Sequence, residues 1–421
     1  MSSAIQYNWI DGAESLENYT VGGYHPVSIG DKLHDRYHVV DKLGFGGYST
    51  VWLARDLLAG RYVALKVGIS GSQAPLREIS IIEALSSQVS SDPLNTDRGL
   101  LPSILDKFEI EGPNGTHSCF TMAPARGDLR EARCPGRGLF SIEVARALCG
   151  GLALAVAEMH SQGYIHGVKL PSSFDELSVD QFYKEYGHPQ TVPITRRDGE
   201  PLPPNVPERA VLPIYLITPA RDFTLPDARV ILSDFGEAFS PSESRLGKDC
   251  HAPLPMQPPE ARHDPNSPLS YSADTWTLAL SLWGIVGMKS IFSDFLTPDE
   301  LVAEHIDILG PLPNPWREGW LAQEAERFDQ TGQRRNVNQR LWSSLEVAFE
   351  EGVQKYRRKL NAGAFDDEEK GAFLSLMRQM LVYRPEERVS AEELLRSEWM
   401  VKWAMPAFER GLGERDGKKG S

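Results

Sequence analysis

A glycine-rich segment between two strand-like runs places the tightest constraint on how this chain can fold. The runs lie at 37–40 and 49–53 and are rich in β-branched and aromatic residues. Glycines between them lack side chains, so backbone N–H groups there can approach an anion such as a phosphate closely. On its own, such a hairpin is more often structural than functional. The segment consists of Leu43, Gly44, Phe45, Gly46, Gly47, Tyr48, Ser49, Thr50 and Val51.

A third strand-like run, at 62–67, ends with a lysine, and a glutamate opens the helical pattern that follows. Lys66 comes after three apolar residues that include Ala64, and a buried ammonium is costly unless an anion pairs with it. Glu78 begins the apolar periodicity of a helix predicted over 75–86. This order of glycine-rich turn, strand lysine and helix glutamate resembles the arrangement in protein kinases, which implies that the glutamate holds the lysine and the lysine contacts phosphates.

An apolar run at 230–233 predicts a strand that leads into Asp-Phe-Gly. The carboxylate of Asp234 is a hard oxygen ligand that suits magnesium, which bridges nucleotide phosphates. Three further residues in the predicted helical part of the chain belong to short motifs. They are Glu260 in Pro-Pro-Glu, Asp274 at the start of an apolar helix, and Arg388.

Taken in this order, the motifs resemble those of eukaryotic-type serine/threonine protein kinases. The resemblance implies that Arg388 pairs with Glu260, and that Asp274 opens the central helix. The group that the chain resembles most is the serine/arginine-protein kinases (SR-protein kinases) with their fungal kinase-like relatives. The residues that indicate this group are Gly23-Tyr24-His25-Pro26-Val27, Tyr37-His38-Val39 and Ser49-Thr50-Val51-Trp52-Leu53-Ala54.

The resemblance implies an α+β, bilobal protein-kinase-like fold, with a small β-rich N-lobe and a large α-helical C-lobe. Nine of the 30 prolines lie between Pro189 and Pro226, which predicts an irregular inserted loop. The end of the chain is rich in glycine and charge, which predicts disorder. The predicted boundaries are 1–36 for an N-terminal extension, 37–404 for the kinase-like domain, 37–122 for its N-lobe, 123–404 for its C-lobe, about 175–228 for the insert and 405–421 for the disordered tail.

The catalytic loop departs from the family. It should read His-x-Asp, with Asn five residues after the Asp; the Asp takes the substrate proton and the Asn binds a second magnesium. His166 matches, but Val168 stands at the Asp position and Ser173 at the Asn position. In a second alignment, Val168 belongs to the strand after the loop, and a block of roughly eight residues is missing rather than substituted. We therefore assign no catalytic residue in this chain.

Two further implications of the resemblance concern the adenine pocket and the activation segment. Met122 would guard the adenine pocket and Ala123 would begin the hinge. Gly167 stands where many kinases have an arginine that binds a phosphate, so the segment 237–257 should need no phosphorylation.

These observations leave several functions open. The first is an ATP-dependent serine/threonine kinase that uses ATP and Mg²⁺. The second is a catalytically inactive pseudokinase that acts as a nucleotide-binding scaffold, and the gap also fits a truncated splice or gene-model form of an active kinase. A small-molecule phosphotransferase is disfavoured by Glu260 together with Arg388 and by the long helical C-terminal part.

The net charge indicates which kinds of partner the chain can bind, and the hydropathy indicates whether it can span a membrane. With 44 Lys plus Arg and 58 Asp plus Glu, the formal net charge is −14, which argues against direct binding of nucleic acid and favours a basic, Arg/Ser-rich protein substrate or partner. The longest apolar stretch, 275–287, is too short to span a membrane, and the N-terminus shows no signal-peptide pattern. The four cysteines have no zinc-like spacing. We therefore expect a monomer of the cytoplasm and/or nucleus.

Overall fold

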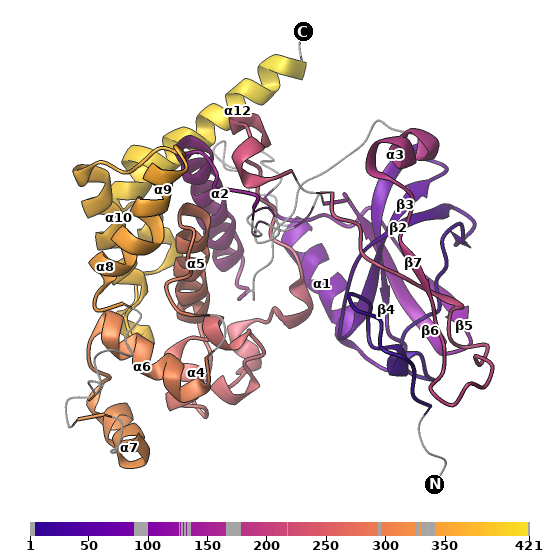
Figure 1. Cartoon of the computed structure of the whole chain (residues 1–421), viewed down its shortest axis with the longest axis horizontal. Coiled ribbons are helices and arrows are strands. Elements are labelled where there is room, and N and C mark those ends of the chain that lie inside the picture. Colours follow the sequence, from indigo (N-terminus) through magenta and orange to yellow (C-terminus); the bar gives the residue numbers. More distant parts are fainter. Residues whose placement is uncertain are drawn as a thin grey trace. The chain divides into compact units, whose positions relative to one another are not determined.

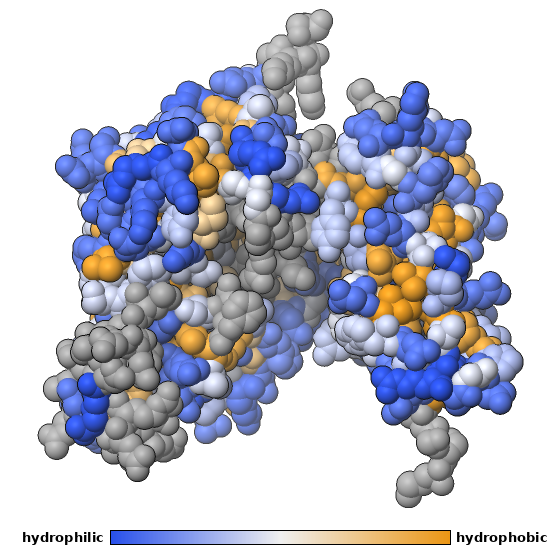
Figure 2. Space-filling view, in the orientation of Figure 1, coloured by the Kyte–Doolittle hydropathy of each residue, from blue (hydrophilic) through white to orange (hydrophobic). Residues whose placement is uncertain are grey.

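The chain folds into two compact units. The small unit comprises 1–128, 170–217 and 233–236, and the large unit comprises 129–169, 218–232 and 237–421. The face drawn in Figure 2 is mainly hydrophilic on both units, with apolar side chains scattered among the polar ones. The computed structural model describes residues 5–419 except 88–99, 126, 128, 130–131, 133–135, 166–177, 217, 294–295, 325–327, 330–334 and 336–341.

The small unit is built on an antiparallel six-stranded sheet with the strand order β1-β2-β3-β4-β6-β5 (Figure 1). Alternate side chains of its central strands, among them Trp52 and Leu65, are buried in one core cluster. One helix, α1 (Ala74–Ser87), contacts β6. The strands are β1 (Lys32–Leu33), β2 (Tyr37–Gly46), β3 (Ser49–Asp56), β4 (Arg61–Gly68), β5 (Asp106–Gly112) and β6 (Gly115–Met122).

The N-terminal extension and the described part of the insert up to residue 216 belong to the small unit, and both are more ordered than their composition predicts. The insert forms α3 (Val179–Tyr186), whose N-terminus carries a capping box between Ser178 and Gln181. Phe182 of α3 is 1% exposed and packs on Tyr62 of β4. Two short strands, β7 (Thr191–Pro193) and β8 (Arg209–Val211), pair further along the insert.

The insert is predicted to be an irregular loop within the C-lobe, but up to residue 216 it lies in the small unit, it contains α3, and the short strands β7 and β8 form among its prolines. The helix α3 ends before the first proline of the cluster, Pro189, so the prolines do not interrupt it. Burial of Phe182 against the sheet then supplies a packing contact that local composition does not report.

The large unit is helical. Its long helix α2 (Ile142–Ser161) begins at the predicted cap, where the hydroxyl of Ser141 accepts from the backbone N–H of Val144. It contacts both α5 (Tyr271–Val286) and α12 (Met405–Lys419). The other helices are α4 (Pro259–His263), α6 (Pro298–Leu309), α7 (Asn314–Glu324), α8 (Leu345–Phe349), α9 (Lys355–Lys359), α10 (Asp367–Met380) and α11 (Ala391–Leu395), with π-helical turns at Glu350–Gln354 and Met400–Ala404.

The C-terminal segment is helical, which corrects the prediction of a disordered tail. In α12, Ala407 and Phe408 are buried, and Gly150 and Gly151 of α2 allow the two helices to approach closely. A Cβ at position 150 would lie 2.9 Å from the carbonyl oxygen of Ala404. The apolar contact stabilises a helix whose glycines and charges disfavour one in isolation.

Of the predicted strand at 230–233, only Ser233 forms a β-bridge. Residues 230–232 belong to no strand, although Val230 and Leu232 are buried. A strand requires a neighbour for its backbone hydrogen bonds, and none is found for these residues within the described ranges. Among the described residues, no helix is long and apolar enough to span a membrane. Short 3₁₀ turns lie at Leu16–Asn18, Ala220–Asp222, Leu225–Asp227, Phe235–Glu237, Pro241–Glu243, Gly247–Asp249, Leu254–Met256 and Pro385–Glu387.

A buried carboxylate in β2 makes the stability of the small unit depend on pH. Asp41 is 1% exposed, one of its oxygens lacks a hydrogen-bond partner among the described residues, and burial raises its pKa from 3.8 to about 6. The unfolded chain therefore loses this proton near pH 4 and the folded chain near pH 6, so stability falls as the pH rises through that window.

We expect Asp41→Asn to remove this pH dependence. Relative to the wild type, the variant should gain about 3 kcal/mol in free energy of unfolding between pH 4 and pH 6.5, since one pKa unit corresponds to about 1.4 kcal/mol. Urea unfolding across this range measures the difference. The exposed Asp35 in the turn before β2 is the matched control, and equal pH profiles for Asp41→Asn and wild type would contradict the prediction.

Candidate functional site

The predicted lysine–glutamate pair forms in the small unit. Lys66 lies on β4, and Glu78 lies on the second turn of α1. The Nζ atom of Lys66 is 2.7 Å from both carboxylate oxygens of Glu78. Glu78 is 3% exposed, so the sheet and the helix shield the pair from water. The position of α1 against the sheet thus determines where the ammonium lies.

Asp234 lies beside the same ammonium. Its Oδ1 atom is 3.6 Å from Nζ of Lys66, and its side chain remains 52% exposed. The backbone of Asp234 has a φ of 68°, a left-handed conformation that aspartate tolerates better than most residues. Phe235 is fully buried, and its backbone N–H donates to Glu78. The buried Phe235 anchors the turn, and the exposed carboxylate of Asp234 is open to a ligand.

The charges of the three groups are coupled. Burial by itself lowers the pKa of Lys66, but the carboxylates of Glu78 and Asp234 more than offset this and leave it raised. Burial also raises the pKa of Glu78, and the ammonium of Lys66 opposes that rise. Lys66 is therefore a firmly charged cation with one buried carboxylate to orient it and one exposed carboxylate beside it.

The glycine-rich hairpin connects β2 to β3 with a turn at 47–48. A Cβ placed on Gly44, Gly46 or Gly47 would meet no atom of the described residues within 4 Å, and none of the three has a positive φ. Neither crowding nor backbone conformation requires glycine there. What glycine provides is access to the backbone, which is the property that phosphate binding needs.

The predicted adenine-pocket residues lie at the end of the sheet that carries Lys66. Met122 is the last residue of β6, and it stands opposite Ala64 of β4 in the register. Ala123 follows directly and is exposed. Two of the predicted positions are thus adjacent across the β4–β6 ladder.

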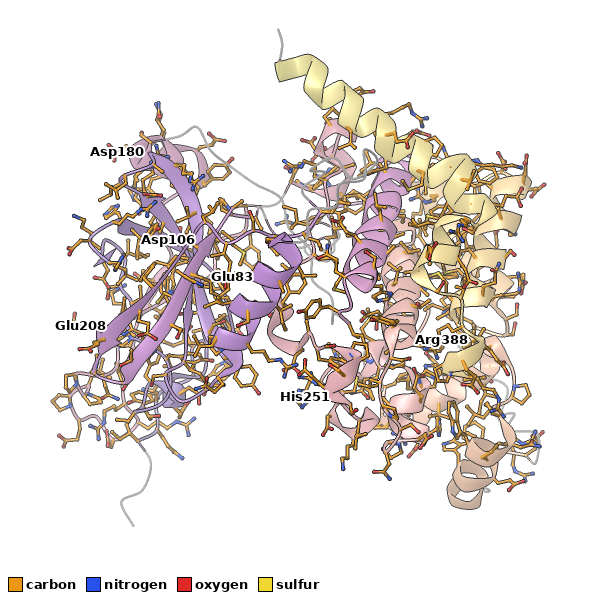
Figure 3. The ribbon with its side chains drawn as sticks, turned by 180° about the vertical axis from the view of Figure 1, so that it is seen from behind. Glu83, Asp106, Asp180, Glu208, His251 and Arg388 are labelled. Carbon is orange, nitrogen blue, oxygen red and sulfur yellow. The ribbon has the colours of Figure 1, made fainter. Side chains whose placement is uncertain are left out.

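In the large unit, Glu260 and Arg388 form the predicted ion pair. Two guanidinium nitrogens of Arg388 contact the two carboxylate oxygens of Glu260 at 2.9 and 3.0 Å, and Arg388 is buried (Figure 3). Arg388 also donates to the carbonyl of Ser272 at 2.6 Å, in the first turn of α5. Asp274, in the same turn, accepts from His160 of α2 at 2.9 Å, a partner that the sequence reading missed. These contacts connect α2, α4 and α5.

Residues within the segment 237–257 contact one another around the carboxylate of Glu237. Arg245 donates to the carboxylate of Glu237 at 2.7 Å, and His251 lies 3.0 Å from the same carboxylate (Figure 3). The guanidinium of Arg245 also lies 5.0 Å from the centre of the Phe239 ring. Sequence reasoning missed Arg245, because nothing in the motif order singles out this arginine.

The predicted catalytic loop cannot be placed. His166, Val168 and Ser173 all lie outside the described residues, and so does Gly167.

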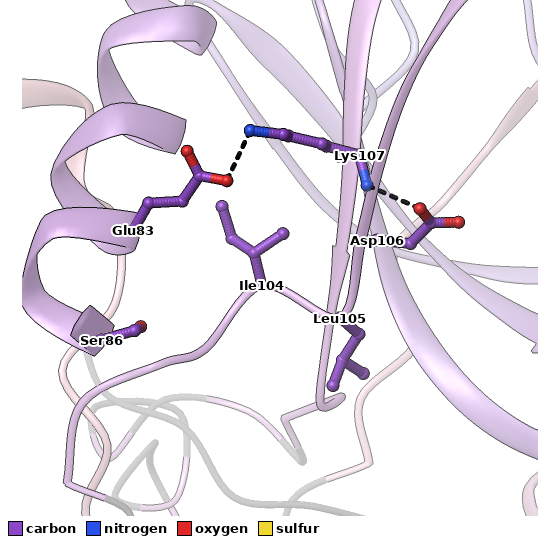
Figure 4. A pocket seen from close by; sticks show the side chains of 6 residues that line it. All are labelled: Glu83, Ser86, Ile104, Leu105, Asp106 and Lys107. Atoms are coloured by element: carbon purple, nitrogen blue, oxygen red, sulfur yellow. Dashed lines mark hydrogen bonds and ion pairs between the residues drawn. The ribbon is translucent and has the colours of Figure 1, made fainter. Parts of the chain in front are cut away.

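A shallow pocket lies between α1 and the strand β5 (Figure 4). Across it, Lys107 of β5 donates to Glu83 of α1 at 2.6 Å. None of the predicted nucleotide-binding residues lines it. The lining residues are Glu83, Ser86, Ile104, Leu105, Asp106 and Lys107.

Comparison with known proteins agrees with this geometry. No protein-family model matches the chain. A serine/threonine protein kinase of Aspergillus fumigatus is 29% identical over 406 residues, which cover 92% of this chain and 90% of that protein. Human SRSF protein kinase 3 is 43% identical over 109 residues, 26% of this chain and 19% of its own length. The kinase spk-1 of Caenorhabditis elegans is 37% identical over 156 residues, 36% of this chain and 16% of its own length.

A solved structure confirms the fold. A crystal structure of a kinase domain superimposes with a TM-score of 0.57 at 18% identity, covering 90% of this chain and 98% of that chain. The β-rich small unit and the helical large unit therefore constitute a bilobal protein-kinase fold. The chain is a relative of serine/threonine protein kinases, and SR-protein kinases are among the proteins related to it.

Removing one partner of the Glu260–Arg388 pair should destabilise the large unit strongly. Arg388→Leu leaves a buried carboxylate without its cation, which costs about 3–5 kcal/mol in the free energy of unfolding. The control is Arg396→Leu, because Arg396 pairs with Glu392 at the surface, where such a pair contributes about 0–1 kcal/mol. Urea unfolding compares the two, and equal losses would show that the buried pair has no special role.

Proposed function

We propose that this chain binds ATP together with Mg²⁺ in its small unit. The observation that supports this most directly is the contact of Lys66 with both Glu78 and Asp234. Glu78 orients the ammonium toward nucleotide phosphates, and the exposed carboxylate of Asp234 suits a magnesium ion. The unobstructed glycine hairpin offers backbone N–H groups to the same phosphates.

A thermal shift with ATP and magnesium tests this proposal. At a ligand concentration 100 times the Kd, binding should add about 2.7 kcal/mol to the free energy of unfolding of the wild type. Lys66→Met should lose this ligand-dependent gain, with each variant compared against its own nucleotide-free midpoint. Absence of any shift in the wild type would refute nucleotide binding.

The chain offers a matched control for Lys66→Met. Lys107 also extends from the sheet to a glutamate of α1, Glu83, but this ion pair is exposed at the surface. The described contacts of Lys107 are with Glu83 and Asp106 and do not include Asp234. Lys107→Met should therefore keep the full shift with ATP.

For phosphoryl transfer, we propose a basic, Arg/Ser-rich protein substrate, toward which the net charge of −14 would steer encounter. ATP would supply the phosphoryl group. With Val168 at the position of the catalytic Asp, no general base is available there, and such a loss lowers the rate by about 10²–10⁴-fold. Radiolabel transfer to an Arg/Ser-rich peptide measures this, and a normal kinase rate would overturn our alignment of the loop.

A second candidate is a nucleotide-binding scaffold, in which the chain engages partners without transferring phosphate. The substitution of the Asp and Asn positions favours it. The other explanation, a block of residues missing beside the catalytic loop, is favoured by the alignment in which Val168 belongs to the strand after the loop. Sequencing the transcript across codons 160–175 separates the two, because a longer form with the Asp and Asn is expected only if a block is missing.

A further inference from the structure

The N-terminal extension and the insert fold together into one buried cluster within the small unit. Backbone pairing joins Tyr7 to Arg196, and Asn205 donates to the carbonyl of Tyr19 at 2.6 Å. The buried members come from both segments, and they are Tyr7, Ala13, Leu16, Tyr19, Tyr24, Ile194, Val206 and Ala210.

This cluster reaches the glycine-rich hairpin through the side chain of Tyr24. The hydroxyl of Tyr24 donates to the carbonyl of Gly46 at 2.8 Å, at the last residue of β2. Gly46 has space around its Cα, so packing against the hairpin itself does not hold this residue in place. The hydrogen bond from Tyr24 is thus an anchor at the tip of the predicted phosphate-binding turn.

The strand that leads into the hairpin receives further contacts from both segments. The ammonium of Lys42 forms an ion pair with Glu14 of the extension, and both side chains are buried. From the insert, Ile214 donates its backbone N–H to the carbonyl of Lys42 at 2.8 Å, and the hydroxyl of Tyr183 donates to the carbonyl of Val40 at 2.8 Å.

The buried ion pair makes docking of the extension a condition for a stable strand. If Glu14 moved away, the fully buried ammonium of Lys42 would lose its anion, which costs several kcal/mol. The extension is therefore a fixed part of β2's surroundings.

The extension also holds the connection between β4 and α1, which carry Lys66 and Glu78. Gly71 donates its backbone N–H to the carbonyl of Gly22 at 2.7 Å, and Ser70 donates to the carbonyl of Gly23 at 3.3 Å. The approach is so close that a Cβ on Gly71 would lie 2.8 Å from the carbonyl oxygen of Gly22. One short segment thus contacts both parts of the proposed nucleotide site.

We propose that Tyr24 is a positioning residue, which sets the position of the glycine-rich hairpin through Gly46 while the insert holds the extension in place. This inference rests on the proposed nucleotide binding. It implies that the extension and the insert tune the affinity for nucleotide although they contribute no group that touches it.

Tyr24→Phe tests the proposal with the smallest possible change. It leaves the ring packing intact and removes the hydroxyl, which is hydrogen-bonded to Gly46 of the hairpin and also to the Asn18 side chain within the extension. Loss of the bond to Gly46 should weaken ATP binding about 3- to 10-fold. In the nucleotide-free protein, amide hydrogen exchange at 44–50 should become faster. The midpoint of thermal unfolding should change no more than in the control.

Tyr7→Phe is the control, because it removes a hydroxyl from the same cluster without changing a described contact to the hairpin. The described hydrogen bonds of Tyr7, to Glu17 and to Arg197 of the insert, are made by its backbone and remain in the variant. Equal ATP affinity and equal exchange at 44–50 in Tyr24→Phe and Tyr7→Phe would overturn the proposal. If the wild type binds no ATP, the proposed function fails, and the exchange at 44–50 alone decides whether Tyr24 positions the hairpin.

Discussion

The proposed site depends on the charge of one lysine in the interior of a sheet. An ammonium placed on β4 is tolerable only with carboxylates beside it, and the small unit supplies Glu78 from α1 and Asp234 from the Asp-Phe-Gly turn. The ion pair between Lys66 and Glu78 holds α1 against the sheet. The buried Phe235 anchors the turn that carries Asp234. The same requirement recurs in the large unit, where Arg388 and Glu260 join segments far apart in the sequence.

Around this centre, the small unit includes the N-terminal extension and most of the insert in addition to the sheet and α1. The extension and the insert pack into one cluster and bind the strand and the connection that carry the site. An inserted segment with many prolines can thus pack as an ordered part of the small unit. In the large unit, the C-terminal helix has a comparable role, because it covers the glycines of α2 with Phe408.

Much of the site could be predicted because its chemistry is local. Lys66, Glu78 and Asp234 each follow a short hydrophobic pattern, and their order along the chain restricts the fold to one class. Tyr24 and Gly46 could not be paired in this way, nor could Glu14 and Lys42. Each of these contacts joins segments with no shared periodicity, and only the folded backbone brings their atoms together. The prediction of a strand failed at 230–232, because a strand depends on a hydrogen-bonded neighbour as well as on its own residues.

The sequence by itself determined the class of fold, the order of the two lobes and the charged groups of the proposed site. It also showed that an Asp and an Asn are absent from the expected positions of the catalytic loop. Only the tertiary structure decided that the extension and most of the insert belong to the small unit, and that residues 405–419 form a helix. The physical reason is that burial of side chains such as Phe182 and Phe408 stabilises these segments. That free energy arises from contacts with distant parts of the chain, so local composition cannot report it.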